Sequence, residues 1–340
     1  MGRDHASCAR EAAIVTERKP VDPLEGGDAD YRSSRAGHRQ SWFGLKRHAK
    51  SLLSRSLPQA ILRGTRRFVP VDRLGRLPAP ANVRSVTGDA HGVAFVMLRP
   101  DRCVVAKELY WGQGHRPRPQ DQFAIEVFAT LAERSDVVLD IGAYTGLFSL
   151  VSTAVNPTLQ AHAFEIVPEV HRLLVENCVR NAVADRVHAH QEGVGAPEFV
   201  MRVPVGSGGS ALPDFYSSRL RFDDGVLVSF RSLDATLDLV PTGGRVLVKI
   251  DVEGTENEVF RHGQSFLATF RPPILCEVLA GVADPAELGS LLAPHGYRFY
   301  LVHEAGLASR PSLEPDPRFR DWLIAPQGAD ELRELGIPVL

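Results

Sequence analysis

The sequence predicts an α/β fold, in which a mostly parallel sheet is covered by helices on both faces. Three segments favour this fold class. Residues 136–155 have the pattern of a buried apolar strand, a glycine turn and an apolar helix. Residues 161–165 form an apolar strand pattern that ends in an acid, and residues 246–267 repeat the order of strand, turn and helix. Strands that alternate with helices in this way are typical of parallel sheets.

The glycine turn follows the first of these strands directly. After the apolar run 137–139 the chain passes through Asp140, Gly142 and Gly146 into the helical segment 147–155. Such turns place backbone N–H groups at the carboxyl edge of a sheet, where open α/β folds bind their ligands. We therefore expect a ligand site at this edge.

Glu165 indicates the kind of ligand. It ends the next strand, about 20 residues beyond Gly146, where an acidic side chain accepts hydrogen bonds from ribose hydroxyls. The turn Gly142-Ala143-Tyr144-Thr145-Gly146 lacks the G-x-G-x-x-G pattern of dinucleotide sites. Because S-adenosylmethionine carries a ribose but no pyrophosphate, it does not need that phosphate cradle. These residues favour it over a nicotinamide dinucleotide.

Five motifs occur in order along the chain: Asp140–Gly146, Phe164–Pro168, Asn177, Asn181 and Lys249–Glu256. Together they resemble the FkbM-type methyltransferases, which are class I S-adenosylmethionine-dependent enzymes. The resemblance implies a class I, Rossmann-like sheet of seven mostly parallel strands, of which the final one is antiparallel, with helices on both faces. It also implies O-methylation of hydroxyls on sugars, polyketides and other secondary metabolites.

The candidate cofactor residues lie in the glycine turn and at the ends of the following strands. They are Asp140, Gly142, Ala143, Tyr144, Thr145, Gly146, Glu165, Ile166, Glu192 and Gly193. The resemblance implies that the turn 192–195 lies near the adenine. For Asp140 an alternative is that its carboxylate only caps the next helix, because acids favour helix N-termini. Asn177 and Asn181 are expected to close a helix rather than touch ligand.

The candidate catalytic residues lie at or near the carboxyl ends of the strands at 246–250 and 274–278. We expect Asp251 to remove the proton from an acceptor hydroxyl, with Glu253 or Glu277 in support, which contributes about 100-fold or more. Lys249 belongs to the same group, with a salt bridge to Glu277 as the alternative role. The three acids would also suit a divalent metal that orients two hydroxyls, and spacing alone does not decide between base and metal.

The remaining elements follow from the same periodicities. We expect strands at 91–98 and 102–109, joined by a Pro100-Asp101 turn, and further strands at 187–191, 199–205, 226–230, 298–302 and 321–325. Helices are expected at 123–132, 169–181 and 285–295, and the segment 306–320 is expected to be a loop. The glycine- and serine-rich segment 206–210 is expected to form part of a lid over the acceptor.

Composition sets the broad class. The 340 residues are 44% hydrophobic and 24% charged, as in soluble globular proteins with a sizeable core. The four cysteines form no C-x-x-C pair, which argues against a zinc cluster or a disulfide framework. No apolar run of about 18 residues and no signal core occur, so a cytoplasmic protein is expected.

Charge and composition divide the chain into four segments. We expect a disordered extension at 1–41, a basic amphipathic helix and linker at 42–85, the methyltransferase-like domain at 86–326 and a tail at 327–340. The helix within 42–67 either packs on the body or contacts an anionic membrane surface. Because the body is acidic overall, nucleic-acid binding is not expected. The oligomeric state is not predicted.

The function expected from the sequence is transfer of a methyl group from S-adenosylmethionine to a hydroxyl. The acceptor would be a small molecule or glycan: a sugar, glycolipid, polysaccharide or secondary metabolite. Three alternatives stay open, namely an N- or carboxyl-methyltransferase, a nicotinamide-dependent oxidoreductase and a non-catalytic module that binds an adenosyl ligand.

Overall fold

The computed structural model describes residues 68–75, 77–203, 225–279 and 284–340. The predictions for the extension at 1–41, the helix within 42–67 and the loop at 206–210 lie outside these residues. In the part of the chain that is described, no helix has the length and apolarity needed to cross a membrane.

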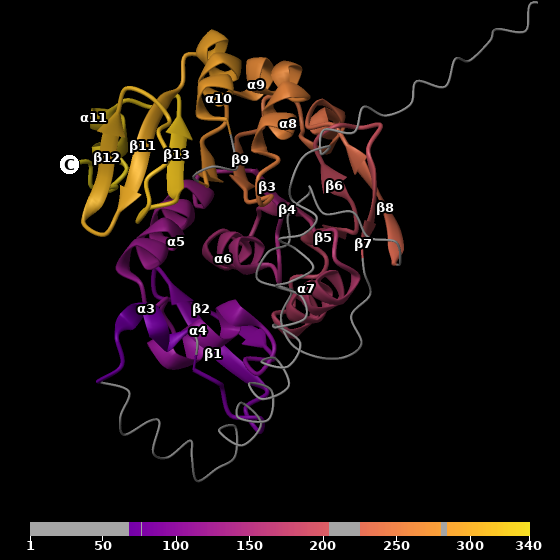
Figure 1. Ribbon diagram of the computed structural model, residues 1–340, viewed down its shortest axis with the longest axis vertical. Coiled ribbons are helices and arrows are strands. Elements are labelled where there is room, and N and C mark those ends of the chain that lie inside the picture. The colour runs from indigo at the N-terminus through magenta and orange to yellow at the C-terminus, as the bar shows by residue number, and fades with distance from the viewer. Residues whose placement is uncertain (1–67, 76, 204–224, 280–283) are drawn as a thin grey trace, which may run out of the picture. The chain divides into compact units, whose positions relative to one another are not determined.

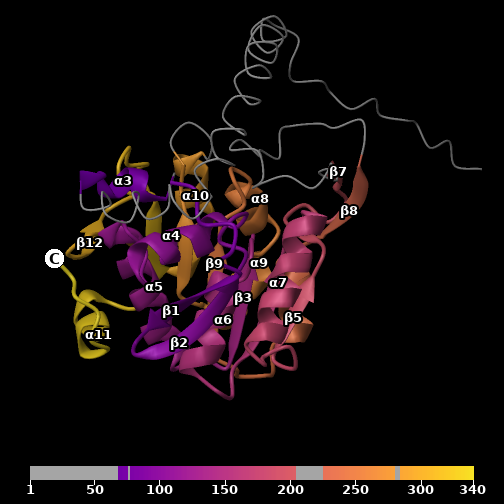
Figure 2. The same cartoon turned by 90° about the horizontal axis from the view of Figure 1, so that it is seen from below.

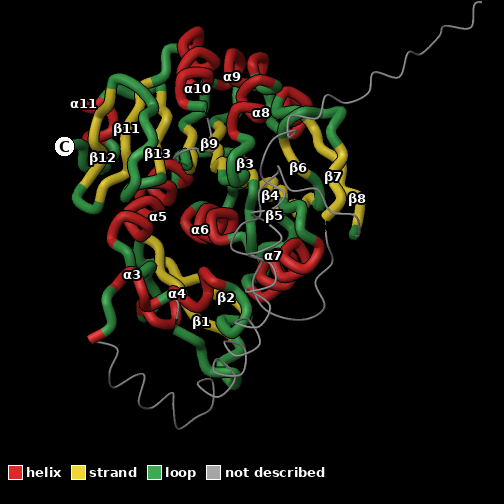
Figure 3. The backbone as a smooth tube through the Cα atoms, in the orientation of Figure 1, coloured by secondary structure: helices red, strands yellow, loops and turns green. Residues whose placement is uncertain are grey.

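The main sheet confirms the predicted α/β fold (Figure 1, Figure 3). Within the described residues it has eight strands in the order β12-β11-β13-β10-β9-β3-β4-β5. Their bounds are β3 Val137–Ile141, β4 Gln160–Phe164, β5 Val187–His190, β9 Val246–Ile250, β10 Ile274–Glu277, β11 Arg298–His303, β12 Gly306–Arg310 and β13 Asp321–Ala325. The block from β10 to β5 is parallel, whereas β13 runs antiparallel to both β10 and β11, as the resemblance implied.

Strand β12 is the addition to the seven expected strands. The prediction of one loop over 306–320 was wrong here, because Gly306–Arg310 pairs antiparallel with β11. Leu307 is fully buried, and its N–H donates to the carbonyl of Pro338 at 2.8 Å. The C-terminal segment, distant in sequence, thus supplies hydrogen bonds and packing that a short five-residue pattern does not reveal.

Helices cover both faces of the sheet (Figure 1, Figure 2). One layer contains α5 Pro119–Ala132, α6 Leu147–Val155 and α7 Pro168–Arg180, and the other contains α8 Glu256–Arg261, α9 Gln264–Phe270 and α10 Pro285–Leu292. Alternate residues of a strand point to opposite faces. Val138 therefore packs in one core and Leu139 in the other, which explains why the central strands are apolar throughout.

The hairpin before the sheet differs from the predicted one. It consists of β1 Ser85–Ala90 and β2 Val93–Leu98, which pair antiparallel. The turn lies at His91 and Gly92, which have φ values of +50° and +74°, rather than at Pro100-Asp101. The predicted second strand at 102–109 was wrong, because Val104–Gly112 forms helix α4 with the Cys103 thiol accepting from the Ala106 N–H at its start. An apolar run of this length suits a helix or a strand equally.

The other described elements are small. Strands β6 Gly193–Val194, β7 Val200–Val203 and β8 Val226–Arg231 form a three-stranded sheet in the order β6-β8-β7, which agrees with the strands expected at 199–205 and 226–230. The short helices are α3 Val71–Leu74, α11 Ala329–Glu334 and the 3-10 helices Asp234–Leu239 and Ala293–His295.

Candidate active site

The turn after β3 is held by hydrogen bonds from both neighbouring strands. The N–H groups of Gly142 and Ala143 donate to the Phe164 carbonyl at 3.0 and 2.9 Å, and the Asp251 N–H donates to the Ile141 carbonyl at 2.9 Å. Gly142 has a φ of +76°, and a Cβ on it would lie 1.8 Å from the Asp251 carbonyl oxygen. Only glycine therefore fits where the ends of β3, β4 and β9 meet.

A cavity of about 600 Å³ opens at this edge of the sheet, a size typical of small-molecule sites. The predicted cofactor residues in its lining are Gly142, Ala143, Tyr144, Glu165, Ile166, Glu192 and Gly193. Asp251 and Glu253 also line it. The structure thus brings together the ends of three parallel strands and the turn at 192–193, which are separated in sequence.

Three candidate cofactor residues lie outside this lining. Asp140 is buried, and its Oδ2 accepts from the N–H and the Oγ of Ser149 at 3.1 and 2.7 Å, while burial raises its pKa to about 6. Thr145 is buried against the Cys103 thiol at 3.1 Å, and Gly146 begins α6 with a φ of +86°. Their positions support the alternative role, in which Asp140 anchors the start of α6 instead of contacting the ligand.

Glu165 directly follows β4, at the carboxyl edge of the sheet. It is buried in the cavity lining, and its Oε1 accepts from the Val167 N–H at 2.8 Å. Burial raises its pKa to about 8, although the backbone N–H groups of Val167 and Tyr144 act in the opposite direction. A carboxylate in this position gains most from a ligand that donates hydrogen bonds.

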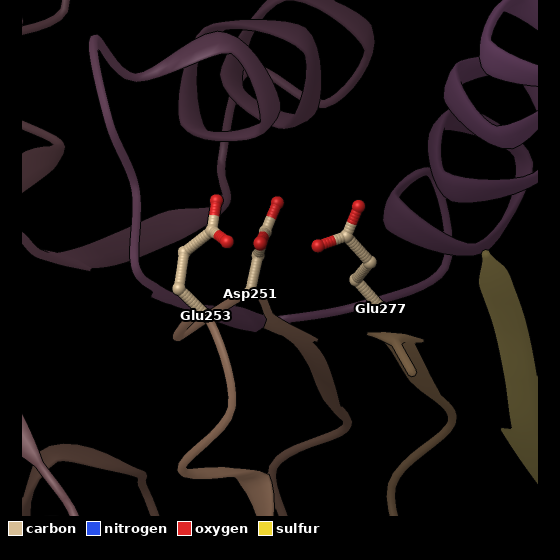
Figure 4. A group of neighbouring side chains, drawn as sticks. All are labelled: Asp251, Glu253 and Glu277. Atoms are coloured by element: carbon tan, nitrogen blue, oxygen red, sulfur yellow. The ribbon is translucent and has the colours of Figure 1, made fainter. Parts of the chain in front are cut away.

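The candidate catalytic acids form one cluster. Figure 4 shows the carboxyl groups of Asp251, Glu253 and Glu277 side by side, and one oxygen of each lies within 4.8 Å of the others. The buried Lys249 places its Nζ 3.4 Å from the Asp251 Oδ2. Lys249 is therefore paired with Asp251 and not with Glu277, which was the alternative expected from the sequence.

Burial and neighbouring charges shift the pKa values in this cluster. Burial, together with the neighbouring carboxylates of Asp251 and Asp321, raises the pKa of Glu277 well above its ordinary value. Burial also raises the pKa of Glu253, whose φ of +53° is unusual for a residue with a side chain. Burial alone would lower the pKa of Lys249, but attraction by Asp251 first, then Asp321 and Glu277, raises it. Lys249 is a cation in this site.

A second cavity of about 190 Å³ adjoins the first. Its lining residues are Arg116, Arg118, Gln120, Asp121, Ala124, Phe148, Lys249, Asp251, Glu277, Val302, Arg318, Arg320 and Asp321. Asp251 lines both cavities. It therefore lies between the space expected for the cofactor and a neighbouring space large enough for part of an acceptor.

The sequence analysis missed the arginines of this second cavity and Asp321. Arg116 and Arg118 precede α5, and Arg318 and Arg320 precede β13, so both pairs form an Arg-x-Arg segment at the start of an element. The repeated Arg-x-Arg pattern could have indicated these residues from the sequence. The position of Arg318, Arg320 and Asp321 in the site depends on β13 lying beside β10, which brings Asp321 opposite Glu277.

The two asparagines of the family-like motif set act outside the cavities. Asn177 accepts from the Leu98 N–H at 2.8 Å and donates to the Thr145 carbonyl at 2.8 Å. Asn181 accepts from the Val96 N–H and donates to the Val96 carbonyl, both at 2.7 Å. Asn181 does close α7, as expected, but the side chains also join β2 to α7 and to the glycine turn.

Part of the chain matches known methyltransferases. Residues 140–299 match the family model described as the methyltransferase FkbM domain. The 31-O-demethyl-FK506 methyltransferase FkbM of Streptomyces tacrolimicus is 32% identical over 112 residues, which are 33% of this chain and 35% of that protein. The matched part thus spans about a third of this curated relative.

Two solved structures are similar to this chain at low sequence identity. Methyltransferase FkbM from Methylobacillus flagellatus KT is 21% identical with a TM-score of 0.37, covering 56% of this chain and 43% of that one. A SAM-dependent methyltransferase from Agrobacterium tumefaciens is 14% identical with a TM-score of 0.39, covering 73% of this chain and 72% of that one. Residues 140–299 therefore match a methyltransferase FkbM domain, and they lie in a mostly parallel sheet that is covered by helices on both faces.

Proposed function

We propose that this chain transfers a methyl group from S-adenosylmethionine to a hydroxyl of a sugar, glycolipid, polysaccharide or secondary metabolite. One observation carries the proposal. Asp251 lies between two adjoining cavities, one of which contains Glu165 and the glycine turn, while the other contains Lys249 and Glu277. A base in this position can reach an acceptor hydroxyl beside the donor.

The residues of the larger cavity suit the donor. The buried Glu165 offers a carboxyl to the ribose hydroxyls, and Ile166, Met201 and Phe230 supply apolar surface for a flat adenine ring. Gly193 lies so close to Phe230 that a Cβ there would meet its ring at 2.3 Å. The glycine therefore permits this aromatic side chain to stand in the cavity wall.

The chain contributes positioning and proton transfer. When bound, the donor supplies an activated methyl group, which leaves sulfur as its bond to the acceptor oxygen forms. Asp251 takes the hydroxyl proton, and Lys249, at 3.4 Å, holds this carboxylate in place. Glu277 lines the smaller cavity together with Asp251, where it is placed to contact the acceptor. Positioning and general base catalysis are the two effects that this reaction needs.

A divalent metal held by Asp251, Glu253 and Glu277 is the alternative within the same site. It predicts that EDTA abolishes methyl transfer and that added Mg²⁺ restores it. If Asp251 acts as a general base without a metal, EDTA leaves the rate unchanged. Lys249 favours the general-base mechanism, because it already places a positive charge beside Asp251.

Calorimetry separates the proposed donor from a nicotinamide dinucleotide. We expect saturable binding of S-adenosylmethionine and of S-adenosylhomocysteine, and none of NAD. Saturable NAD binding without a response to S-adenosylmethionine would overturn the proposal.

Transfer of a labelled methyl group into a metabolite extract then separates an enzyme from a binding module. Because methyl ethers survive mild alkali and methyl esters do not, alkali treatment of the product distinguishes hydroxyl from carboxyl acceptors.

The pH dependence of donor binding tests the role of Glu165. Ribose hydroxyls donate to the charged carboxylate, so binding favours the deprotonated form and lowers the pKa of Glu165 in the complex. Below the free protein's pKa of about 8, binding must release a proton. The Kd for S-adenosylhomocysteine should therefore rise by up to about tenfold for each pH unit below that value, until the pKa of the complex is reached.

Calorimetry at several pH values from about 6 to about 9 measures this effect. Glu165→Gln serves as the comparison, because its amide does not titrate: its affinity should be lower at alkaline pH and nearly flat across the range. A wild-type affinity that is equally flat contradicts a role for Glu165 in donor binding.

A further inference from the structure

The smaller cavity is lined by arginines from two segments of the chain. Arg116 and Arg118 come from the start of α5, and Arg318 and Arg320 come from the residues before β13. Arg318 lines only this cavity, whereas the other three also line the larger one. The same cavity is also lined by Lys249 and by four acids, Asp121, Asp251, Glu277 and Asp321.

The two arginines of the first pair differ in their ion pairs. Arg116 is held by Glu108 and Asp121 at 2.7 and 3.1 Å, and its side chain is 18% exposed. Arg118 is half-buried and forms no ion pair with any residue of the described ranges. A guanidinium in a cavity wall without an acidic partner leaves several donors available to a ligand.

The two arginines of the second pair form few ion pairs with residues of the cavity lining. Arg318 pairs with Glu304 at 3.3 Å, and Glu304 does not belong to the cavity lining. Arg320 lies 3.9 Å from Glu277, and its side chain is 58% exposed. A contact of this length on an exposed side chain leaves the guanidinium of Arg320 available to a ligand.

We propose that the acceptor carries a phosphate or a carboxylate, which Arg118, Arg318 and Arg320 bind while a hydroxyl of the same molecule meets Asp251. This inference rests on the proposed function and deepens it, because it defines the substrate class as an anionic hydroxyl compound. The planar guanidinium fork matches both oxyanions in a bidentate manner. Arg118 has no acidic partner among the described residues, so a neutral acceptor would leave its charge unpaired beside the reacting hydroxyl.

The first test uses inorganic phosphate and protein saturated with S-adenosylhomocysteine, so that the larger cavity is filled. Phosphorus NMR at constant ionic strength, balanced with KCl, should show saturable binding. The double variant Arg118→Gln and Arg318→Gln should weaken it by about tenfold or more. Arg172→Gln, an exposed arginine on α7 outside both cavities, should leave it unchanged. Absence of saturable binding, or equal binding by the double variant, overturns the inference.

The second test identifies which oxyanion is bound. The protein saturated with S-adenosylhomocysteine and phosphate is titrated with glucose 6-phosphate, glucuronate or methyl glucoside. The better of the two anions should displace phosphate, whereas the neutral glucoside should not. Displacement by the glucoside as effective as by either anion overturns the inference.

The S-adenosylhomocysteine affinity of each variant separates this inference from the proposed function. If the wild-type protein does not bind S-adenosylhomocysteine, the proposed function fails. A second outcome is that the wild-type protein binds S-adenosylhomocysteine, while the variants Arg118→Gln and Arg320→Gln lose that binding and still bind phosphate. In that case the arginines bind the donor, and only the inference fails. Arg318→Lys guards against misfolding, because it keeps the charge without the fork and should bind phosphate with intermediate affinity.

Discussion

The substitution Asp251→Asn is expected to slow methyl transfer by about 100-fold or more while the Kd for S-adenosylmethionine stays nearly unchanged. The amide has the shape of the carboxylate but cannot accept the hydroxyl proton. Lys249 keeps its charge in the variant, because Asp321 and Glu277 also attract it. Single-turnover transfer of a labelled methyl group measures the rate, and calorimetry measures the affinity.

The control for this prediction is Asp330→Asn, the same chemical change on α11, where the side chain is 93% exposed and pairs with Arg333. It should leave rate and affinity as they are. Two results would contradict the role assigned to Asp251: a rate that falls less than about fivefold, or an affinity that falls as much as the rate.

The substitution Gly142→Ala is expected to destabilise the domain by about 4 kcal/mol or more, or to prevent folding. Its Cβ would lie 1.8 Å from the Asp251 carbonyl oxygen, and the backbone φ of +76° is itself unfavourable for alanine. Neither atom can move alone, because the Asp251 N–H is bonded to Ile141 and the Gly142 N–H to Phe164. The clash must therefore separate β3 from β9.

Gly92→Ala is the matched control for this prediction. Gly92 has a φ of +74°, nearly that of Gly142, but nothing lies within 4 Å of the added Cβ. Its cost is the backbone strain alone, about 1 kcal/mol. Urea unfolding of both variants measures the difference. Equal losses would show that the turn at Gly142 relaxes without cost and that its close approach to Asp251 is unimportant for stability.

The errors in the sequence analysis have a common physical origin. The segment 102–109 was expected to be a strand, but buried contacts of Ala106 and Leu109 on one side of a helix stabilise α4. Likewise β12 forms because the C-terminal residues hydrogen-bond to Leu307. In both cases the local pattern suits two structures, and partners far away in sequence choose between them.

Asp140 shows why a correct motif can still mislead on the role of one residue. Its place after the apolar strand and before Gly142 is what the motif predicts, and the turn does line a cavity. The side chain, however, points to Ser149 and supports α6. The periodicity of a strand tells on which side a residue lies only once the neighbouring layers are known.

The amino-acid sequence by itself determined the parallel sheet, the glycine turn and the acids Glu165 and Asp251 at the strand ends, because period and turn chemistry are local properties. The tertiary structure alone decided which groups share a cavity, which pKa values burial shifts, and that Arg118, Arg318 and Arg320 line the space beside Asp251. Those properties arise from the order of strands in the sheet. That order depends on pairing between distant segments, such as Val137 of β3 and Val246 of β9, which are 109 residues apart, and no short window of sequence contains both.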